Sequence, residues 1–111
     1  MPHCIIEHSH DINGGELLIP LHETVQASGL FSADGSDIKV RAASFTQHLA
    51  GGQQAPFMHV CLRILSGRTE AQKTSLSHAV AGVLVARGPA GCAVTVEVVD
   101  MDRATYAKQK I

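Results

Sequence analysis

The chain has 111 residues, of which 45% are hydrophobic and 17% are charged, and its formal net charge is −1. This composition predicts one globular domain with a moderate core, because the chain is too apolar to stay disordered. The small net charge excludes a general attraction to nucleic acid or to anionic membranes. No signal-like segment follows Met1, and no stretch approaches the roughly 18 apolar residues of a membrane span. We therefore expect a soluble, cytoplasmic protein.

The first half of the chain predicts a strand, a helix and a second strand. Apolar and β-branched residues indicate a strand over Pro2–Glu7. A short helix is expected from about Glu16 to Ser28, and Gly29 ends it. A second strand is expected over Ile38–Phe45.

The second half repeats this order. Alternation of residue types indicates a strand over Phe57–Leu65, and Thr69 with Gln72 forms a capping box at the start of a helix that Gly88 and Pro89 end. Valines at every second position then indicate a fourth strand. The residues expected to face the core are Met58, Val60, Leu62 and Ile64 in the strand, Leu76, Val80, Val83 and Leu84 in the helix, and Val94, Val96 and Val98 in the last strand.

Each half is thus a β-α-β unit, and we interpret 2–45 and 57–100 as pseudo-repeats within one domain that spans 1–111. A right-handed crossover makes the two strands of each unit parallel neighbours. Two such units side by side form a mixed four-stranded sheet with both helices on one face, which is an α+β fold.

The opposite face of this sheet is then left uncovered. By parity it contains Cys4 and Ile6 or their neighbours, together with Cys61, Thr95 and Val99. Such a face is too apolar for water, so we expect other subunits to bury it. The tail 102–111 is expected to be exposed or to cross to another subunit.

Two groups of residues with other potential roles are interpreted as structural. We predict that the widely spaced cysteines Cys4, Cys61 and Cys92 are small core hydrophobes. The pairs Gly14-Gly15 and Gly51-Gly52 do not fit a phosphate-binding pattern, so we predict turns.

Seven histidines, including His8 and His10, raise the question of a metal site. No Cys-x-x-Cys or His-Glu-x-x-His spacing accompanies them. We therefore expect no metal and no cofactor.

Pro2 is the candidate for chemistry. If Met1 is removed, Pro2 becomes a secondary amine at the chain end, where proline can act as a base or nucleophile. An unperturbed α-amino group has a pKa of roughly 7.7–8, and an apolar pocket or nearby cations would lower that pKa toward neutrality. If Met1 is retained, the nitrogen of Pro2 is an amide without basicity.

These features resemble the tautomerase superfamily, whose members use an amino-terminal proline. The resemblance rests on Pro2 at the start of a strand, on the pair of β-α-β units and on the segment Gly67-Arg68-Thr69-Glu70-Ala71-Gln72-Lys73 before the second helix. Within the superfamily the chain is most similar to the 5-carboxymethyl-2-hydroxymuconate delta-isomerases, over nearly its whole length. The matching segments are Met1-Pro2-His3 with Ile5-Ile6-Glu7, then 27–31, 37–42 and 57–60.

The resemblance implies an isomerase of aromatic-compound catabolism that converts a polycarboxylate dienol to its unsaturated ketone. It implies a homotrimer, no cofactor, and Pro2 as the base that moves the proton. Fixed cations must also hold the carboxylates and stabilise the developing enolate. Arg68, beside the positive end of the second helix, is one expected clamp. Lys39 and Arg41 share one face of their strand, and either or both could be the second clamp.

Two further positions, Thr95 and His59, bear on the predicted site. Thr95 stands where the shorter 4-oxalocrotonate tautomerase carries an arginine, which shifts the expected second cation to Lys39 or Arg41. His59 lies on the strand face opposite the core, and it is either a neighbour of the site or an interface residue.

Two other functional classes also stay open. One is dehalogenation or decarboxylation by the same proline, which an acidic partner near Pro2 beyond Glu7 would favour, and none is evident. The other is a non-enzymatic oligomer that uses the fold as a binding module.

Overall fold

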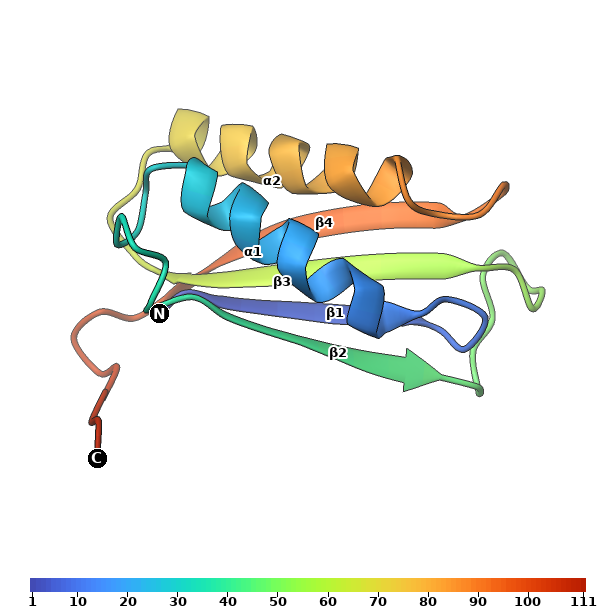
Figure 1. Ribbon diagram of the computed structural model, residues 1–111, viewed down its shortest axis with the longest axis horizontal. Coiled ribbons are helices and arrows are strands. Elements are labelled where there is room, and N and C mark those ends of the chain that lie inside the picture. The colour runs from blue at the N-terminus through green and yellow to red at the C-terminus, as the bar shows by residue number, and fades with distance from the viewer.

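The computed structural model describes residues 1–111 and shows a four-stranded sheet with both helices packed on the same face (Figure 1). The strand order is β2-β1-β3-β4, with β1 parallel to β2, β3 parallel to β4, and β1 antiparallel to β3. This confirms the predicted α+β fold with a mixed sheet. The elements in chain order are β1 (His3–Ser9), the 3-10 helix η1 (Gly14–Leu17), α1 (Leu18–Ala27), β2 (Lys39–Phe45), β3 (Phe57–Leu65), α2 (Glu70–Val85) and β4 (Ala93–Met101).

Each half of the chain contributes one parallel pair of strands joined through a helix. The interpretation of 2–45 and 57–100 as pseudo-repeats stays a prediction. Neither helix has the length and the apolar character needed to cross a bilayer.

The segment before α1 differs from the prediction. Gly14 and Gly15, which we expected in a simple turn, open η1, and the α-helix begins only at Leu18. The Asn13 side chain accepts a hydrogen bond of 3.1 Å from the Gly15 amide and so starts this 3-10 turn. A Cβ atom at Gly14 would collide with the His8 imidazole, because the chain here passes close over β1.

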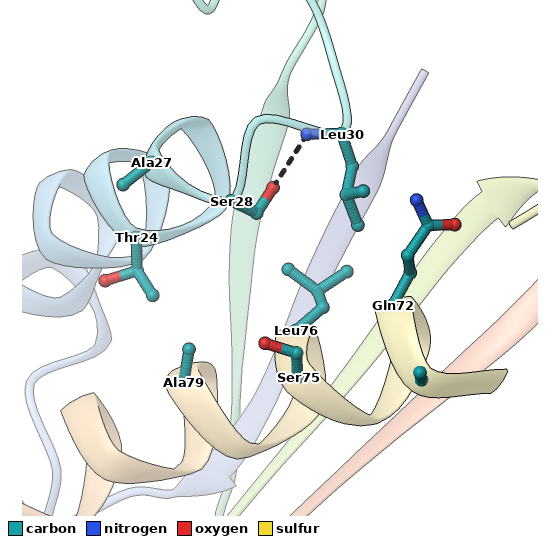
Figure 2. A pocket seen from close by; sticks show the side chains of 9 residues that line it. Thr24, Ala27, Ser28, Leu30, Gln72, Ser75, Leu76 and Ala79 are labelled. Carbon is teal, nitrogen blue, oxygen red and sulfur yellow. Dashed lines mark hydrogen bonds between the residues drawn. The ribbon is translucent and has the colours of Figure 1, made fainter. Parts of the chain in front are cut away.

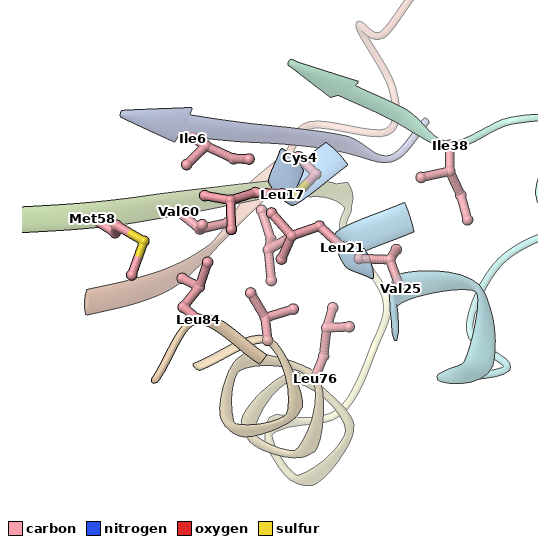
Figure 3. Close-up of a cluster of buried hydrophobic side chains, with 12 residues drawn as sticks. Cys4, Ile6, Leu17, Leu21, Val25, Ile38, Met58, Val60, Leu76 and Leu84 are labelled. Atoms are coloured by element: carbon pink, nitrogen blue, oxygen red, sulfur yellow. The ribbon is translucent and has the colours of Figure 1, made fainter. Parts of the chain in front are cut away.

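The core lies between the sheet and the two helices (Figure 3). The alternation in β3 is confirmed, because all four of its predicted core residues are fully buried. The capping box of Thr69 and Gln72 at the start of α2 is also confirmed. The buried residues of the helices are Leu21 and Val25 in α1 and Leu76, Val80 and Leu84 in α2, whereas Val83 is only partly buried.

The parity of β1 is now settled. Cys4 and Ile6 face the helices and are fully buried, so the uncovered face carries their neighbours His3, Ile5 and Glu7. The cross-strand register places Ile5 beside Cys61 on that face.

The cysteine prediction holds for one residue of three. Cys4 belongs to the core, but Cys61 is half-buried on the uncovered face and Cys92 is half-buried at the margin of the core. Alternation decides this outcome, because Cys61 lies between the core-facing residues Val60 and Leu62.

One end of the sheet gathers segments that are distant in the sequence. Since β1 and β3 are antiparallel, the beginnings of β1 and β2 meet the ends of β3 and β4 at this edge. The last turn of α1, the start of α2, the amino terminus and the start of the carboxyl-terminal tail lie at the same end (Figure 1). All the basic residues that we proposed for substrate binding come from these segments.

Candidate active site

Pro2 is anchored at this end of the sheet. Its side chain is buried, and its carbonyl oxygen accepts a hydrogen bond of 3.1 Å from the Lys39 amide. The amine of Met1, which precedes it, has a pKa lowered from 8.0 to about 6. Burial is the largest cause, followed by a hydrogen bond with Lys39 and the charges of Lys39 and Lys108, while Asp37 acts in the opposite direction. The environment of the chain end thus disfavours an ammonium group.

A row of basic side chains crosses the uncovered face beside the chain end. The register places Lys39, His3 and Arg63 next to one another on β2, β1 and β3. Arg41 lies two residues further along β2, so Lys39 and Arg41 share a face as predicted. Arg41 Nη1 donates a hydrogen bond of 3.2 Å to His3 Nδ1, and Lys39 Nζ donates one of 3.0 Å to the Asp37 carbonyl.

The pKa of His3 is lowered by its burial and by the positive charges of this row. Burial lowers it, and so do the charges of Arg41, the chain-end amine, Lys39 and Arg63, in that order. His3 is therefore held neutral at pH 7. A neutral imidazole beside the cationic side chains of Arg41, Lys39 and Arg63 marks a place where a negatively charged ligand would be favoured.

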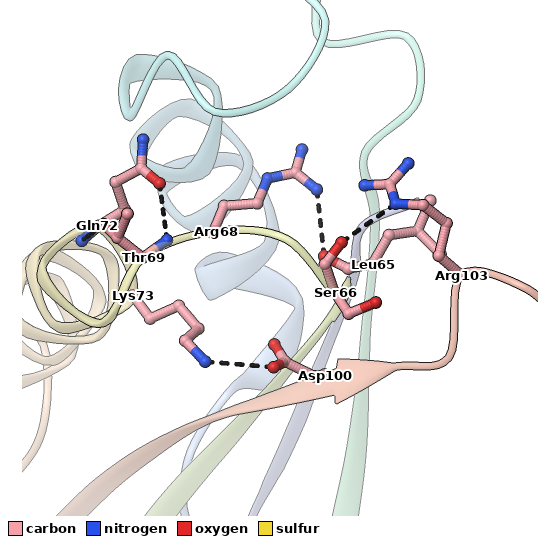
Figure 4. Close-up of polar contacts among 8 residues, drawn as sticks. All are labelled: Leu65, Ser66, Arg68, Thr69, Gln72, Lys73, Asp100 and Arg103. Atoms are coloured by element: carbon pink, nitrogen blue, oxygen red, sulfur yellow. Dashed lines mark hydrogen bonds and ion pairs between the residues drawn. The ribbon is translucent and has the colours of Figure 1, made fainter.

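Arg68 lies at the same end of the sheet, and its guanidinium is already engaged with the backbone. Nη2 donates to the Leu30 carbonyl at 2.7 Å. Nη1 donates to the Leu65 carbonyl at 3.2 Å (Figure 4). The guanidinium carbon also lies 5.2 Å from the centre of the Phe31 ring. Arg68 therefore joins the loop after α1 to the end of β3. Since a guanidinium has five N–H groups, donors remain for a ligand.

The contacts at the start of α2 and the end of β4 complete this edge. Lys73 forms an ion pair of 3.2 Å with Asp100, and Arg103 Nε donates to the Ser66 carbonyl at 3.1 Å (Figure 4). The Lys73 pair is partly exposed to water and contributes little to stability. The Arg103 contact holds the first part of the carboxyl-terminal tail against the loop that precedes Arg68.

His59 and Thr95 form a separate polar cluster on the uncovered face. His59 contacts the Thr95 hydroxyl through Nδ1 at 2.7 Å and pairs with the Glu97 carboxylate through Nε2. His59 is the cross-strand neighbour of Glu7, so it lies roughly 16 Å along β1 from Pro2. Within one chain His59 is therefore remote from the chain end.

The two main hollows of the molecule do not coincide with the basic row. A groove of about 600 Å³ runs between α1 and α2, and its walls include small side chains such as Ala27, Ser75 and Ala79 (Figure 2). A cleft of about 550 Å³ lies beside η1. Neither is lined by Pro2 or by any of the basic residues proposed as clamps. The chain end thus lies outside both hollows.

A protein-family model described as 5-carboxymethyl-2-hydroxymuconate isomerase matches residues 2–110. The chain belongs to this family. Membership confirms the predicted resemblance to the 5-carboxymethyl-2-hydroxymuconate isomerases, and it assigns the chain as an isomerase. No curated protein sequence matches the chain.

Solved structures agree with the fold of this 5-carboxymethyl-2-hydroxymuconate isomerase family member. Pt0534 inactivated by 2-oxo-3-pentynoate is similar with a TM-score of 0.83 and 19% identity, over 96% of this chain and 90% of that one. A 5-carboxymethyl-2-hydroxymuconate isomerase from Deinococcus radiodurans R1 gives 0.78 and 21%, over 99% and 90%. A fused 4-OT wild-type symmetric trimer gives 0.76 and 12%, over 96% and 93%. At these identities the likeness establishes the fold.

Three residues at the chain end of this family member were not among the predicted site residues. His3 appeared only within the matching segment Met1-Pro2-His3, and Arg63 was not singled out. Tyr106 lies in the tail, where its hydroxyl is 2.9 Å from His3 Nε2. No local sequence pattern points to Tyr106, because it is 103 positions from His3.

Proposed function

We propose that this protein isomerises a dienol with several carboxylates, of the 5-carboxymethyl-2-hydroxymuconate type, to its unsaturated ketone in the breakdown of aromatic compounds. The observation that carries the proposal is a chain-end amine of lowered pKa beside a row of basic side chains. That pKa is the one of the Met1 amine, and after removal of Met1 the same surroundings would keep the Pro2 amine neutral at pH 7. The basic row provides the charge that a polycarboxylate requires.

Pro2, exposed by removal of Met1, is the proposed base. Its nitrogen takes the proton of the enol hydroxyl, which leaves the electron pair on oxygen as a dienolate. The conjugated chain moves that negative charge to a distant carbon, and the protonated Pro2 returns the same proton there. The proton is thus transferred within the substrate, and no oxidant, reductant or cofactor takes part.

Lys39, Arg41 and Arg68 are the proposed cationic clamps. Lys39 lies beside the chain end, where its hydrogen bond and its charge lower the pKa of the Met1 amine. Arg41 is oriented by its hydrogen bond to His3. Arg68 keeps N–H groups beyond the two that it donates to Leu30 and Leu65. Each clamp would hold a carboxylate or stabilise the dienolate oxygen, which becomes more negative as the proton leaves.

We further propose that three copies assemble through their uncovered sheet faces into a homotrimer. The half-buried Ile5, Cys61 and Val99 on that face support this proposal, because such side chains favour a protein neighbour over water. Several structural relatives are 4-OT trimers. In a trimer the open chain end would be closed by the adjacent copy. A light-scattering mass equal to one chain of 11.7 kDa at micromolar concentration would contradict the assembly.

The test compares two preparations of the same chain, one with Met1 removed and one with Met1 retained, each verified by intact mass. The conversion of 5-carboxymethyl-2-hydroxymuconate is followed by ultraviolet absorbance. We expect activity only in the trimmed preparation, because an amide nitrogen is not a base. Pro2→Ala in the trimmed form replaces the secondary amine with a primary one, and it should lower kcat while the oligomer stays folded. Full activity in the preparation that retains Met1 would refute the mechanism.

A further inference from the structure

The carboxyl-terminal tail returns to the amino-terminal end of β1. Its first turn is closed by Thr105 Oγ1, which donates to the Asp102 carboxylate at 3.1 Å, and by the Tyr106 amide, which donates to the Asp102 carbonyl at 3.1 Å. This turn brings the Tyr106 ring edge-on to the His3 ring, with 6.2 Å between their centres. Tyr106 is half-buried there, beside the residue that follows Pro2.

The hydrogen bonds among Arg41, His3 and Tyr106 have a forced direction. A guanidinium only donates, so His3 Nδ1 must accept the hydrogen bond from Arg41. A neutral imidazole whose Nδ1 accepts carries its proton on Nε2. His3 Nε2 therefore donates to the Tyr106 oxygen across 2.9 Å. The contact with His3 uses the Tyr106 oxygen as an acceptor, and the phenolic proton stays free for another group.

The charges around Tyr106 indicate which kind of group would accept its phenolic proton. Burial lowers the pKa of His3 most, and the charges of Arg41, Lys39 and Arg63 lower it further, which keeps this direction of hydrogen bonding in place. Lys108, two residues beyond Tyr106, adds its positive charge at the chain end. A free phenolic O–H among these cations suits an oxyanion, because hydrogen bonds to ionised acceptors are the strong ones.

We propose that Tyr106 is a substrate-binding residue whose hydroxyl donates a hydrogen bond to a carboxylate or enolate oxygen of the ligand. His3 is the residue that positions the hydroxyl, and Arg41 sets the tautomer of His3. This inference rests on the proposed function for the place of the ligand, and it adds a neutral donor on the tail to the charged clamps of the sheet.

The protein offers a direct readout of this contact. It contains one tyrosine and no tryptophan, so its intrinsic fluorescence comes from Tyr106 alone. The probe is adipate, a six-carbon dicarboxylate that neither reacts nor absorbs where tyrosine does. We expect adipate to change the Tyr106 emission in a saturable manner, with the same dissociation constant as calorimetry gives. Adipate that binds by calorimetry without changing the emission would overturn the inference.

The variant Tyr106→Phe keeps the ring against His3 and removes only the hydroxyl. We expect adipate to bind about 10-fold to 100-fold more weakly, as for the loss of one hydrogen bond to a charged group. The KM for 5-carboxymethyl-2-hydroxymuconate should rise by a similar factor, with a smaller change in kcat. The matched control is Thr105→Ala, which removes the Thr105 hydrogen bond to Asp102 but keeps the Tyr106 hydroxyl and the hydrogen bond from the Tyr106 amide to the Asp102 carbonyl, which closes the same turn.

The outcomes separate this inference from the proposed function. If the trimmed enzyme is active and Tyr106→Phe binds adipate as tightly as the unmodified chain, the inference is wrong while the proposed function stands. If Thr105→Ala loses as much affinity as Tyr106→Phe, Tyr106 only fastens the tail, and the inference is again wrong. If the trimmed protein isomerises no dienol, the proposed function fails, and the fluorescence titration still decides whether Tyr106 contacts an anion.

Discussion

Replacement of Arg68 by alanine should lower the free energy of unfolding as well as the activity. The variant loses the hydrogen bond of 2.7 Å to the Leu30 carbonyl, the one of 3.2 Å to the Leu65 carbonyl, and the contact with the Phe31 ring. Each hydrogen bond contributes about 1 kcal/mol at a half-buried position, and the ring contact contributes about 0.5–1 kcal/mol. We therefore expect a loss of about 2–3 kcal/mol, since the effects share one side chain.

The measurement is urea unfolding followed by circular dichroism at one fixed chain concentration, because the stability of an oligomer depends on concentration. Arg103→Ala is the matched control, since it removes one exposed hydrogen bond to the Ser66 carbonyl and should cost less than about 1 kcal/mol. Arg68→Lys keeps the charge but not the two-pronged contact. It should restore more of the activity than of the stability.

The result that would refute this reasoning is an Arg68→Ala variant whose unfolding free energy lies within about 0.5 kcal/mol of the unmodified chain, the size of an ordinary surface substitution. In that case the contacts with Leu30 and Leu65 would contribute nothing net. A variant with normal stability and a large loss of kcat/KM would assign Arg68 to substrate binding alone.

Three further predictions concern single groups. In the chain that retains Met1, the pKa of the amine is about 6 in the folded protein and 8.0 ordinarily. Between these pH values the folded chain binds fewer protons than the unfolded chain, so the free energy of unfolding should rise as the pH rises from 6 to 8. The midpoints of urea unfolding at pH 6 and pH 8 test this. The prediction is wrong if a chain with an acetylated amino terminus gains the same stability over this pH range. Thr69→Ala should cost about 1 kcal/mol in the same unfolding assay through loss of the α2 cap, and no change would show that Gln72 suffices. Burial raises the pKa of Cys4 to about 12, so mass-spectrometric mapping of thiol alkylation should find it unmodified in the folded protein, and rapid labelling would contradict its burial.

The sequence by itself determined the features that depend on near neighbours. The alternation over Phe57–Leu65 predicted β3 and its buried face, because side chains of a strand point to opposite faces in turn. Thr69 and Gln72 predicted the start of α2, because a capping box joins residues only three positions apart. The parallel pairing within each β-α-β unit followed from the handedness of the crossover.

Only the tertiary structure decided the features that depend on register and on distant packing. Parity alone allowed either face of β1 to be the covered one, and the position of the helices buried Cys4 rather than His3. Arg68 was expected to clamp a carboxylate, and no sequence pattern indicated its backbone contacts with the Leu30 carbonyl in the loop after α1 and the Leu65 carbonyl at the end of β3. His3 and Tyr106 are 103 positions apart and meet because the tail turns back at Asp102. Such a contact has no local pattern, since it depends on the path of the whole chain.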